Sequence, residues 1–258
     1  MSQTIERIAV VIEDDADIRE VIEVILIEAG FEVKLASTGA AGVELVRAFD
    51  PILTTLDVNM AGMDGFETLK RIRLLTARSI IMISARFDEI DVVRGLSAGA
   101  DDFVAKPFRT GELRARIDAV LRRAPAAEPA AAPAVTEPAS APPPKLAASA
   151  WLEHDGLRLD PARRVVEAEG ESVLLTRSEF DLLANLIQGD DRVHTKAELI
   201  LELRGERYAT SGVVTAADKR SLEVHVANVR KKIGQVSTGA DRIETVRGVG
   251  YRLRGAGT

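Results

Sequence analysis

The first 123 residues alternate between short apolar runs and longer stretches of helical periodicity, and few folds accommodate that alternation. Between the runs, apolar residues return every three or four positions, as Ile18, Ile22 and Ile25 do, which is typical of a helix with one buried face. Strand-like apolar runs lie at 8–12, 31–36, 52–56, 79–84 and 102–105. Five strands alternating with helices predict an α/β fold in which a parallel sheet is covered on both faces.

Polar residues gather where these strands end, and they come from four of the five strands. In chain order they are Glu13, Asp14, Asp57, Ser84 and Lys106. The carboxyl ends of parallel strands meet at one edge of the sheet, where ligands of such folds bind. Capping of the next helix explains one acid, for which we favour Asp15. The remaining carboxylates are therefore expected to surround a cation, and oxygen ligands favour Mg²⁺, with Mn²⁺ as an alternative.

The other residues at this edge indicate what the cation serves. A carboxylate can act as a nucleophile toward a phosphoryl donor, and Asp57 on the expected central strand is the best placed. A metal would neutralise the phosphoryl oxygens, while the Lys106 ammonium and the Ser84 hydroxyl could hold others. The sequence therefore predicts a phosphoacceptor site.

Residues 124–149 separate this part from the rest of the chain. Seven of the ten prolines lie in this segment, which has no aromatic residue and cannot bury a core. We interpret it as a flexible linker between a domain at 1–123 and a domain at 150–258. As a coil of this length it would span about 30 Å and transmit little torque, so direct mechanical coupling of the domains is not expected.

The last hundred residues predict a small α+β domain. Short strands are expected at 157–160, 163–168 and 172–175. A helix is expected from Thr176, with Glu179 completing a capping box, and another over 195–203. A third helix should begin near Asp218. Residues 219–254 carry 9 Lys/Arg against 3 Asp/Glu, although the whole chain has a net charge of −6, so one face suits an anionic partner.

The third helix has two different faces. Leu222, Val226, Val229 and Ile233 form a narrow apolar stripe that should face the core. The opposite face presents cations, an amide and small apolar contacts, a set that suits a DNA major groove, although a merely solvated basic face would look the same. Its members are Arg220, Val224, Ala227, Asn228 and Lys231. His225 lies at the edge of the stripe and is expected to be structural.

Several motifs, in order, resemble one family. 'VVIEDDADIR', 'LDVNMAGMDG', 'IIMISAR' and 'GADDFVAKPF' are similar to the signatures of a two-component receiver domain. 'LTRSEFDLLANL', 'LEVHVANVRKKI' and 'ETVRGVGYRLR' are similar to a winged-helix DNA-binding domain. Together they resemble the OmpR/PhoB family of transcriptional response regulators, and the likeness covers nearly all of the chain outside the linker. It implies a flavodoxin-like receiver followed by a winged helix.

The resemblance also implies roles for residues. Mg²⁺ would be held by Glu13, Asp14, Asp57 and the carbonyl of Asn59, and Asp57 would accept the phosphoryl group, which Ser84 and Lys106 would contact. Ser84 and Phe103 would be the switch residues, although Phe103 stands where the family commonly has tyrosine. Arg247 in the wing would enter a minor groove. Ala61 replaces the usual proline after Met60, and Arg204 replaces a tryptophan.

The partners follow from the same resemblance. They are a sensor histidine kinase, double-stranded DNA, a second copy of the chain on phosphorylation and, through the loop at 205–217, RNA polymerase. Receiver pairing would use a face on 88–98, 102–105 and 110–122 that carries both signs of charge. The charged residues expected there are Arg94, Asp101, Asp102, Glu112 and Arg116.

Other classes of protein fit the sequence less well. A phosphohydrolase with an aspartyl nucleophile usually carries an acid two residues later, where this chain has Asn59, so no enzyme is expected. A flavodoxin-like FMN module would need a phosphate loop after the first strand, where three acids would repel phosphate. A phosphorylation-independent regulator would not need the complete acceptor set. The chain has no cysteine and no apolar run long enough to span a bilayer, which favours the cytoplasm.

Overall fold

The computed structural model describes residues 7–85, 89–123, 151–189, 191–204, 214–236 and 242–254. The linker expected at 124–149 lies outside these residues, as does most of the loop at 205–217. No helix in the described ranges is long and apolar enough to cross a membrane.

The N-terminal part contains the predicted five-stranded parallel sheet. Its strands are β1 (Ile8–Ile12), β2 (Glu32–Ala36), β3 (Leu53–Asp57), β4 (Ser79–Ser84) and β5 (Asp102–Ala105). They lie in the order β2-β1-β3-β4-β5, with every pair parallel. The predicted strands agree with these bounds to within one residue. The order reverses direction at β1 and β3, and ligand sites of such sheets form beside that point.

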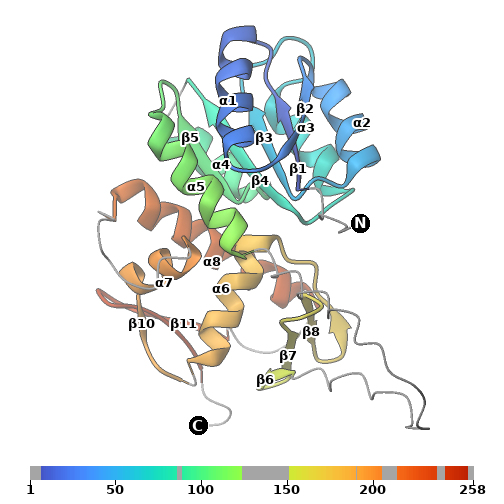
Figure 1. Cartoon of the computed structure of the whole chain (residues 1–258). Coiled ribbons are helices and arrows are strands. Elements are labelled where there is room, and N and C mark those ends of the chain that lie inside the picture. Colours follow the sequence, from blue (N-terminus) through green and yellow to red (C-terminus); the bar gives the residue numbers. More distant parts are fainter. Residues whose placement is uncertain are drawn as a thin grey trace, which may run out of the picture.

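Five helices cover the sheet, on both of its faces (Figure 1). They are α1 (Ala16–Glu28), α2 (Gly39–Phe49), α3 (Gly65–Arg73), α4 (Glu89–Ser97) and α5 (Thr110–Arg123). The apolar residues of α1 and α5 pack on one face, and those of α2, α3 and α4 pack on the other. Asp15 caps α1 as predicted, because its carboxylate accepts the backbone N–H groups of Asp17 and Ile18.

The C-terminal part is a winged-helix domain. Its antiparallel sheet contains β6 (Leu152–His154), β7 (Leu157–Asp160), β8 (Val165–Ala168) and β9 (Glu171–Ser172). Its helices are α6 (Arg177–Gln188), α7 (Lys196–Leu203) and α8 (Ala216–Val236). A second sheet has the order β10-β12-β11, formed by His194–Thr195, Gly250–Leu253 and Ile243–Val246. The hairpin β11–β12 is the predicted wing.

Two details of this part differ from the sequence interpretation. The strand expected at 172–175 is β9, which ends at Ser172. The ladder makes one more hydrogen bond, from Val173 N to Val166 O, before the chain turns into the N-terminus of α6 at Thr176. The short strands β6 and β10 were not predicted, because three and two residues carry too little pattern.

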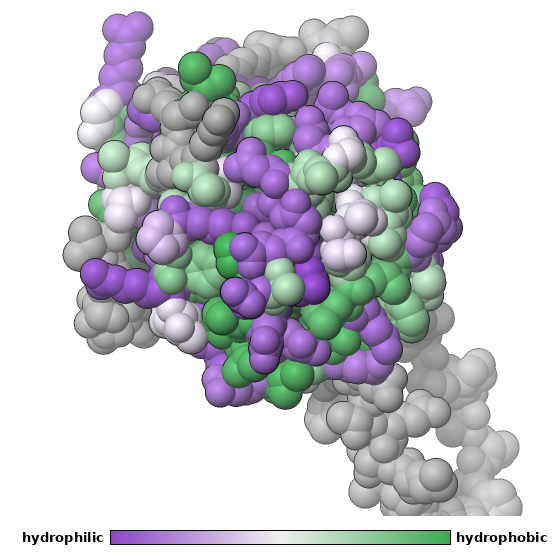
Figure 2. Space-filling model, turned by 90° about the horizontal axis from the view of Figure 1, so that it is seen from above, coloured by the Kyte–Doolittle hydropathy of each residue, from purple (hydrophilic) through white to green (hydrophobic). Residues whose placement is uncertain are grey.

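The two parts pack directly against each other, with α8 lying against α4 (Figure 1). Val224 of α8 belongs to the same apolar cluster as Val92 and Leu96 of α4. This corrects the expectation that no direct coupling exists, which considered only the linker and not the surfaces that it connects. Figure 2 looks onto the opposite, outer end of the molecule, where hydrophilic and hydrophobic residues are interspersed over the surface.

Candidate functional site

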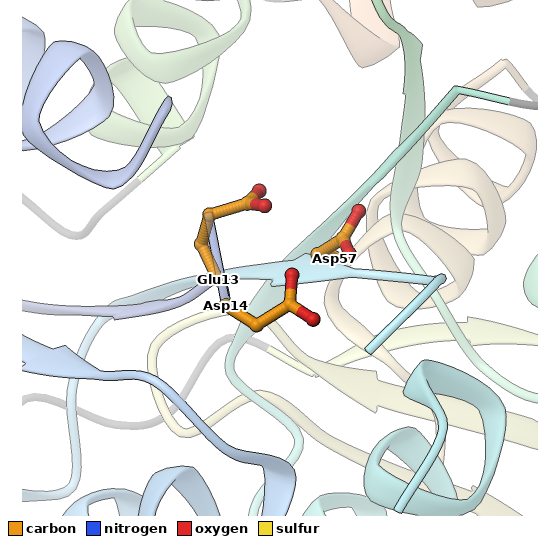
Figure 3. Close-up of side chains that lie close together, drawn as sticks. All are labelled: Glu13, Asp14 and Asp57. Carbon is orange, nitrogen blue, oxygen red and sulfur yellow. The ribbon is translucent and has the colours of Figure 1, made fainter. Parts of the chain in front are cut away.

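Three carboxylates converge at the carboxyl edge of the receiver sheet. The register pairs Ile12 with Leu56, so the next residues, Glu13 and Asp57, lie side by side. Each of Glu13, Asp14 and Asp57 offers an oxygen within 4.8 Å of the others, and their side chains point toward one common space (Figure 3). Glu13 and Asp57 are buried while Asp14 is exposed, so the cluster opens on one side to solvent.

Lys106 is the cation that the structure places among these acids. Its Nζ lies 2.8 Å from Asp57 Oδ1 and 2.8 Å from Glu13 Oε1. Burial alone would lower the pKa of Lys106, but the hydrogen bonds to Asp57 and Glu13 raise it above its usual value. Burial and the nearby Asp57 charge together raise the pKa of Glu13, against the lowering effect of Lys106. One ammonium therefore offsets only part of the charge of three carboxylates.

The donor set fits a hard divalent cation. The three acids of the cluster offer only carboxylate oxygens, which Mg²⁺ and Mn²⁺ prefer. Glu13 Oε2 is buried without an aligned hydrogen-bond donor, although Lys106 Nζ lies within 2.8 Å of it. That oxygen and the excess negative charge are what a metal ion would satisfy. Glu13, Asp14 and Asp57 are the side chains that would hold it, and a metal there would neutralise charge on a phosphoryl group.

The remaining predicted receiver residues surround this cluster to different degrees. Ser84 is fully buried at the end of β4, beside the Asp57 strand, and its carbonyl accepts the Lys106 N–H at 2.7 Å. Asn59 is exposed and donates its backbone N–H to Asp57 Oδ2 at 3.1 Å. The Lys106–Pro107 peptide bond is cis. Phe103 is buried on β5, with its ring against Gly95 of α4.

The residues predicted to contact DNA fall into two groups. Ala227, Lys231 and Arg247 are exposed, and Arg220 is half-buried. Val224 and Asn228, by contrast, face the receiver: Val224 is buried, and Asn228 Nδ2 donates to Leu96 O at 3.0 Å. The expectation that this whole helix face is open to DNA is therefore wrong for the described conformation, because α4 covers its centre.

The residues predicted for receiver pairing all have partners within the chain. Arg116 bonds both oxygens of Asp102, at 2.6 and 2.7 Å, and also Glu112. Arg94 is exposed, with its guanidinium carbon 4.0 Å from the centroid of the Phe66 ring. Asp101 is not on the surface as expected: it is buried and pairs with a cation of α3, Arg73, at 2.6 Å. A role of this face in pairing stays a prediction.

Sequence reasoning missed the buried hydrogen-bond group around Asp101 that joins the two parts, although it expected His225 to be structural. Ser178 at the start of α6 donates its N–H to Asp101 Oδ1 at 2.9 Å, and His225 Nε2 lies 3.2 Å from Asp101 O. Arg73 holds the other carboxylate oxygen of Asp101. The available signal was on α8, where the apolar Val224 lies on the same predicted face as Arg220 and Lys231. An apolar residue at such a place indicates a covering partner.

Comparison with known proteins agrees with both parts of the structure. Residues 9–118 match the response regulator receiver domain family, and residues 170–253 match the family described as transcriptional regulatory protein, C terminal. The transcriptional regulatory protein CseB of Streptomyces avermitilis is 41% identical over 244 residues, which cover 94% of this chain and 96% of that one. The DNA-binding response regulator MtrA of Mycolicibacterium smegmatis is 32% identical over 249 residues, covering 96% and 97%.

A solved structure extends the likeness to the whole fold. A mutant of RitR superposes with a TM-score of 0.68 at 21% identity, covering 97% of this chain and all of that one. A receiver with a carboxylate cluster, followed by a winged helix, defines a response regulator. The chain belongs to the OmpR/PhoB family of such transcriptional regulators, which act on transcription rather than as enzymes in the usual sense.

Proposed function

We propose that the chain controls transcription through Mg²⁺-dependent phosphorylation of Asp57 by a partner histidine kinase. The observation that carries this proposal is the convergence of three carboxylates and Lys106 at the edge of the sheet. In this role an Asp57 oxygen attacks the phosphorus of a phosphohistidine, and the P–N bond breaks as the imidazole leaves. Lys106 and the Ser84 hydroxyl would bind phosphoryl oxygens. Mn²⁺ would serve in place of Mg²⁺.

The C-terminal part, residues 150–258, would bind double-stranded DNA. Its α8 carries the candidate major-groove residues, Arg220, Val224, Ala227, Asn228 and Lys231, and Arg247 lies exposed in the turn of the wing. Cations at these places favour phosphate contact, and Asn228 could read adenine. Contact with DNA and with a kinase assigns this function to the bacterial cytoplasm, with RNA polymerase as a further partner.

Phosphorylation would act by pairing receivers. Two receivers joined through the face on α4, β5 and α5 would hold two DNA-binding domains together, and the second would then bind its half-site at a high effective concentration. Residues 124–149, interpreted as a linker, would let the half-site spacing vary more than a short linker would.

Phosphorylation of the full chain tests this function. With Mg²⁺ and a small acyl phosphate, the protein should gain one phosphoryl group by intact mass, sediment as a dimer and bind paired half-sites more tightly. Asp57→Asn should lose all three responses. Asp50→Asn is the matched control, because Asp50 is exposed and has the left-handed conformation (φ 38°) that asparagine tolerates. A phosphorylated chain that stays monomeric while binding paired sites cooperatively would contradict the pairing step.

A further inference from the structure

Two basic side chains lie beside the carboxylate cluster, and they bind it in different ways. The Lys106 ammonium contacts carboxylate oxygens directly, 2.8 Å from both Glu13 and Asp57. Arg19 of α1 instead contacts the main chain of the acids: its Nη1 donates to the carbonyl oxygen of Glu13 at 2.7 Å and to that of Asp14 at 3.3 Å. These two contacts place positive charge beside the cluster without occupying a carboxylate oxygen.

The helix α1 by itself does not explain an arginine at this place. Arg19 lies at the end of the first helical turn, which Asp15 caps, and a cation near a helix N-terminus opposes the helix dipole. Side chains of a helix lean toward its N-terminus, which brings the guanidinium of Arg19 back over residues 13 and 14. The half-buried Arg19 therefore serves the peptide that precedes the helix.

The peptide that Arg19 holds joins two of the three acids. Because a peptide unit is planar, fixing its carbonyl oxygen restrains the Cα atoms of both Glu13 and Asp14. The bond of 2.7 Å from the guanidinium is charge-assisted and therefore strong, and Glu13 N is anchored to Ala36 O at 3.0 Å. The direction in which both side chains leave the end of β1, toward Asp57 in Figure 3, is set at this peptide.

Asp14 is the acid whose orientation depends most on its main chain. Glu13 and Asp57 are buried, and both carboxylates bind the same ammonium, which fixes them. The Asp14 side chain is exposed, and its carboxylate accepts the Ala61 N–H at the long distance of 3.3 Å. A bond of that length holds a solvated carboxylate weakly, so the orientation of Asp14 follows from the peptide that Arg19 holds.

We propose that Arg19 is a positioning residue of the metal site, which holds the Glu13–Asp14 peptide so that both carboxylates are directed at the metal before it binds. The inference deepens the proposed function, because it takes the three acids as the Mg²⁺ ligands. Ligands that are already oriented lose less conformational freedom on binding. Groups that orient metal ligands contribute roughly 10–100-fold to metal affinity, so removing Arg19 should weaken metal binding about tenfold.

The sign of the effect separates positioning from simple electrostatics. A cation beside the site repels a metal ion, so if Arg19 acted through its charge alone, its removal would strengthen metal binding. If Arg19 orients the ligands, its removal weakens binding. If Arg19 only stabilises the fold, its removal lowers the unfolding temperature and leaves the dissociation constant of the metal unchanged.

Binding of Mn²⁺ to the full unphosphorylated chain tests the proposal without any reaction. The electron paramagnetic resonance signal of free hydrated Mn²⁺ falls as the ion is bound, which gives the dissociation constant. Arg19→Ala should raise that constant about tenfold, and Arg19→Lys, whose ammonium can still donate to the Glu13 carbonyl, should recover part of the loss. The matched control is Arg71→Ala, which removes an arginine from an exposed pair with Glu67 on α3 and should bind Mn²⁺ as the wild type does.

Phosphorylation by a small acyl phosphate gives a second readout. The Mg²⁺ concentration that supports half of the maximal rate should rise about tenfold in Arg19→Ala, because the metal binds more weakly. The rate at saturating Mg²⁺ should stay close to that of the wild type, because Asp57 keeps its own hydrogen bond to Lys106.

The outcomes separate this proposal from the proposed function. Weaker Mn²⁺ binding in Arg19→Ala supports it when Arg19→Lys recovers affinity or when the unfolding temperature in chelator is unchanged. Equal or tighter binding in Arg19→Ala overturns it and leaves the proposed function standing. A loss that Arg19→Lys does not recover, together with a lower unfolding temperature, also overturns it, because the fold is then damaged. If the wild type binds no Mn²⁺, the metal-dependent function fails, and the role of Arg19 fails with it.

Discussion

Two buried aspartates of the receiver, Asp57 and Asp101, each form an ion pair with one basic side chain, but they have different roles. Asp57 ends β3 and lies 2.8 Å from Lys106, and Asp101 precedes β5 and lies 2.6 Å from Arg73. Asp57, however, shares its cation with Glu13 and lies beside a third carboxylate, Asp14, so its surroundings keep an excess of negative charge. Asp101 has one cation and two backbone N–H donors for its carboxylate. The excess negative charge around Asp57, and not its burial or its ion pair, distinguishes the candidate metal and phosphoryl site from the structural junction at Asp101.

The largest expected difference between Asp57 and Asp101 is in phosphorylation. Asp57→Asn should abolish uptake of a phosphoryl group from acyl phosphate with Mg²⁺, because the nucleophile is gone, and withdrawing Mg²⁺ should do the same to the wild type. Asp101→Asn should still be phosphorylated, since Asp101 lies outside the cluster. Intact mass and peptide mapping measure both. A phosphoryl group mapped to another residue of the wild type would show that Asp57 is not the phosphoacceptor.

The free energy of unfolding should fall in Asp101→Asn and rise in Asp57→Asn. Asp101→Asn leaves Arg73 without its buried partner, and breaking such a pair costs about 3–5 kcal/mol in the free energy of unfolding. Asp57→Asn relieves repulsion from Glu13 and Asp14 and should stabilise by about 1 kcal/mol in the absence of metal. Urea unfolding in buffer with a chelator measures both. A loss of stability in Asp57→Asn would mean that its pairing with Lys106 outweighs the repulsion.

This contrast also explains what the sequence could predict. Strand bounds follow from alternation over many residues, whereas the flavodoxin-like strand order was implied by the family resemblance alone. The acid site follows from topology, since the carboxyl ends of parallel strands meet at one edge. Asp15 could be assigned as a cap because capping is local. The junction depends on how two surfaces 77 residues apart, at Asp101 and Ser178, fit together. The periodicity of a sequence does not indicate which surfaces pack together, and Asp101 was therefore predicted to be an exposed charge.

The second contrast lies within the DNA-binding domain, between the exposed wing and the covered helix. Arg247→Ala should weaken binding to every duplex and reduce the salt dependence by about one phosphate contact. Asn228→Ala should cost about 1–3 kcal/mol only on sites where Asn228 reads a base, and it should loosen the packing of α8 on α4 by removing the bond to Leu96. Fluorescence anisotropy on specific and random duplexes separates the two. An equal loss on all duplexes would make Asn228 a backbone contact.

The smallest expected effect concerns pH and the histidine of the junction. Burial lowers the pKa of His225, and the nearby carboxylates of Asp101, Glu179 and Asp102 raise it only in part. Its Nδ1 is buried without a hydrogen-bond partner, so a second proton there has no acceptor. The packed junction between the two domains therefore keeps His225 neutral at pH values where an exposed histidine, with a pKa of about 6.5, is already charged.

The sign of the pH effect follows from this difference. Above pH ~6.5 His225 is neutral whether the two domains are packed together or apart, and the junction has its full stability. As the pH falls below that value, His225 can take up a proton when the domains separate but not while they are packed, so their separation becomes up to about tenfold easier per pH unit. Arg116 and Asp218, which line a cavity beside His225, keep their charges over this range and do not supply the effect.

Small-angle scattering of the full chain between pH 7.5 and 5.5 measures the opening as a rise in the radius of gyration. His225→Gln is the informative control, because its amide can donate to Asp101 O as Nε2 does but does not titrate. The rise should be present in the wild type and absent in His225→Gln. The same rise in both proteins would show that some other group opens the junction and that His225 only fills space between the domains.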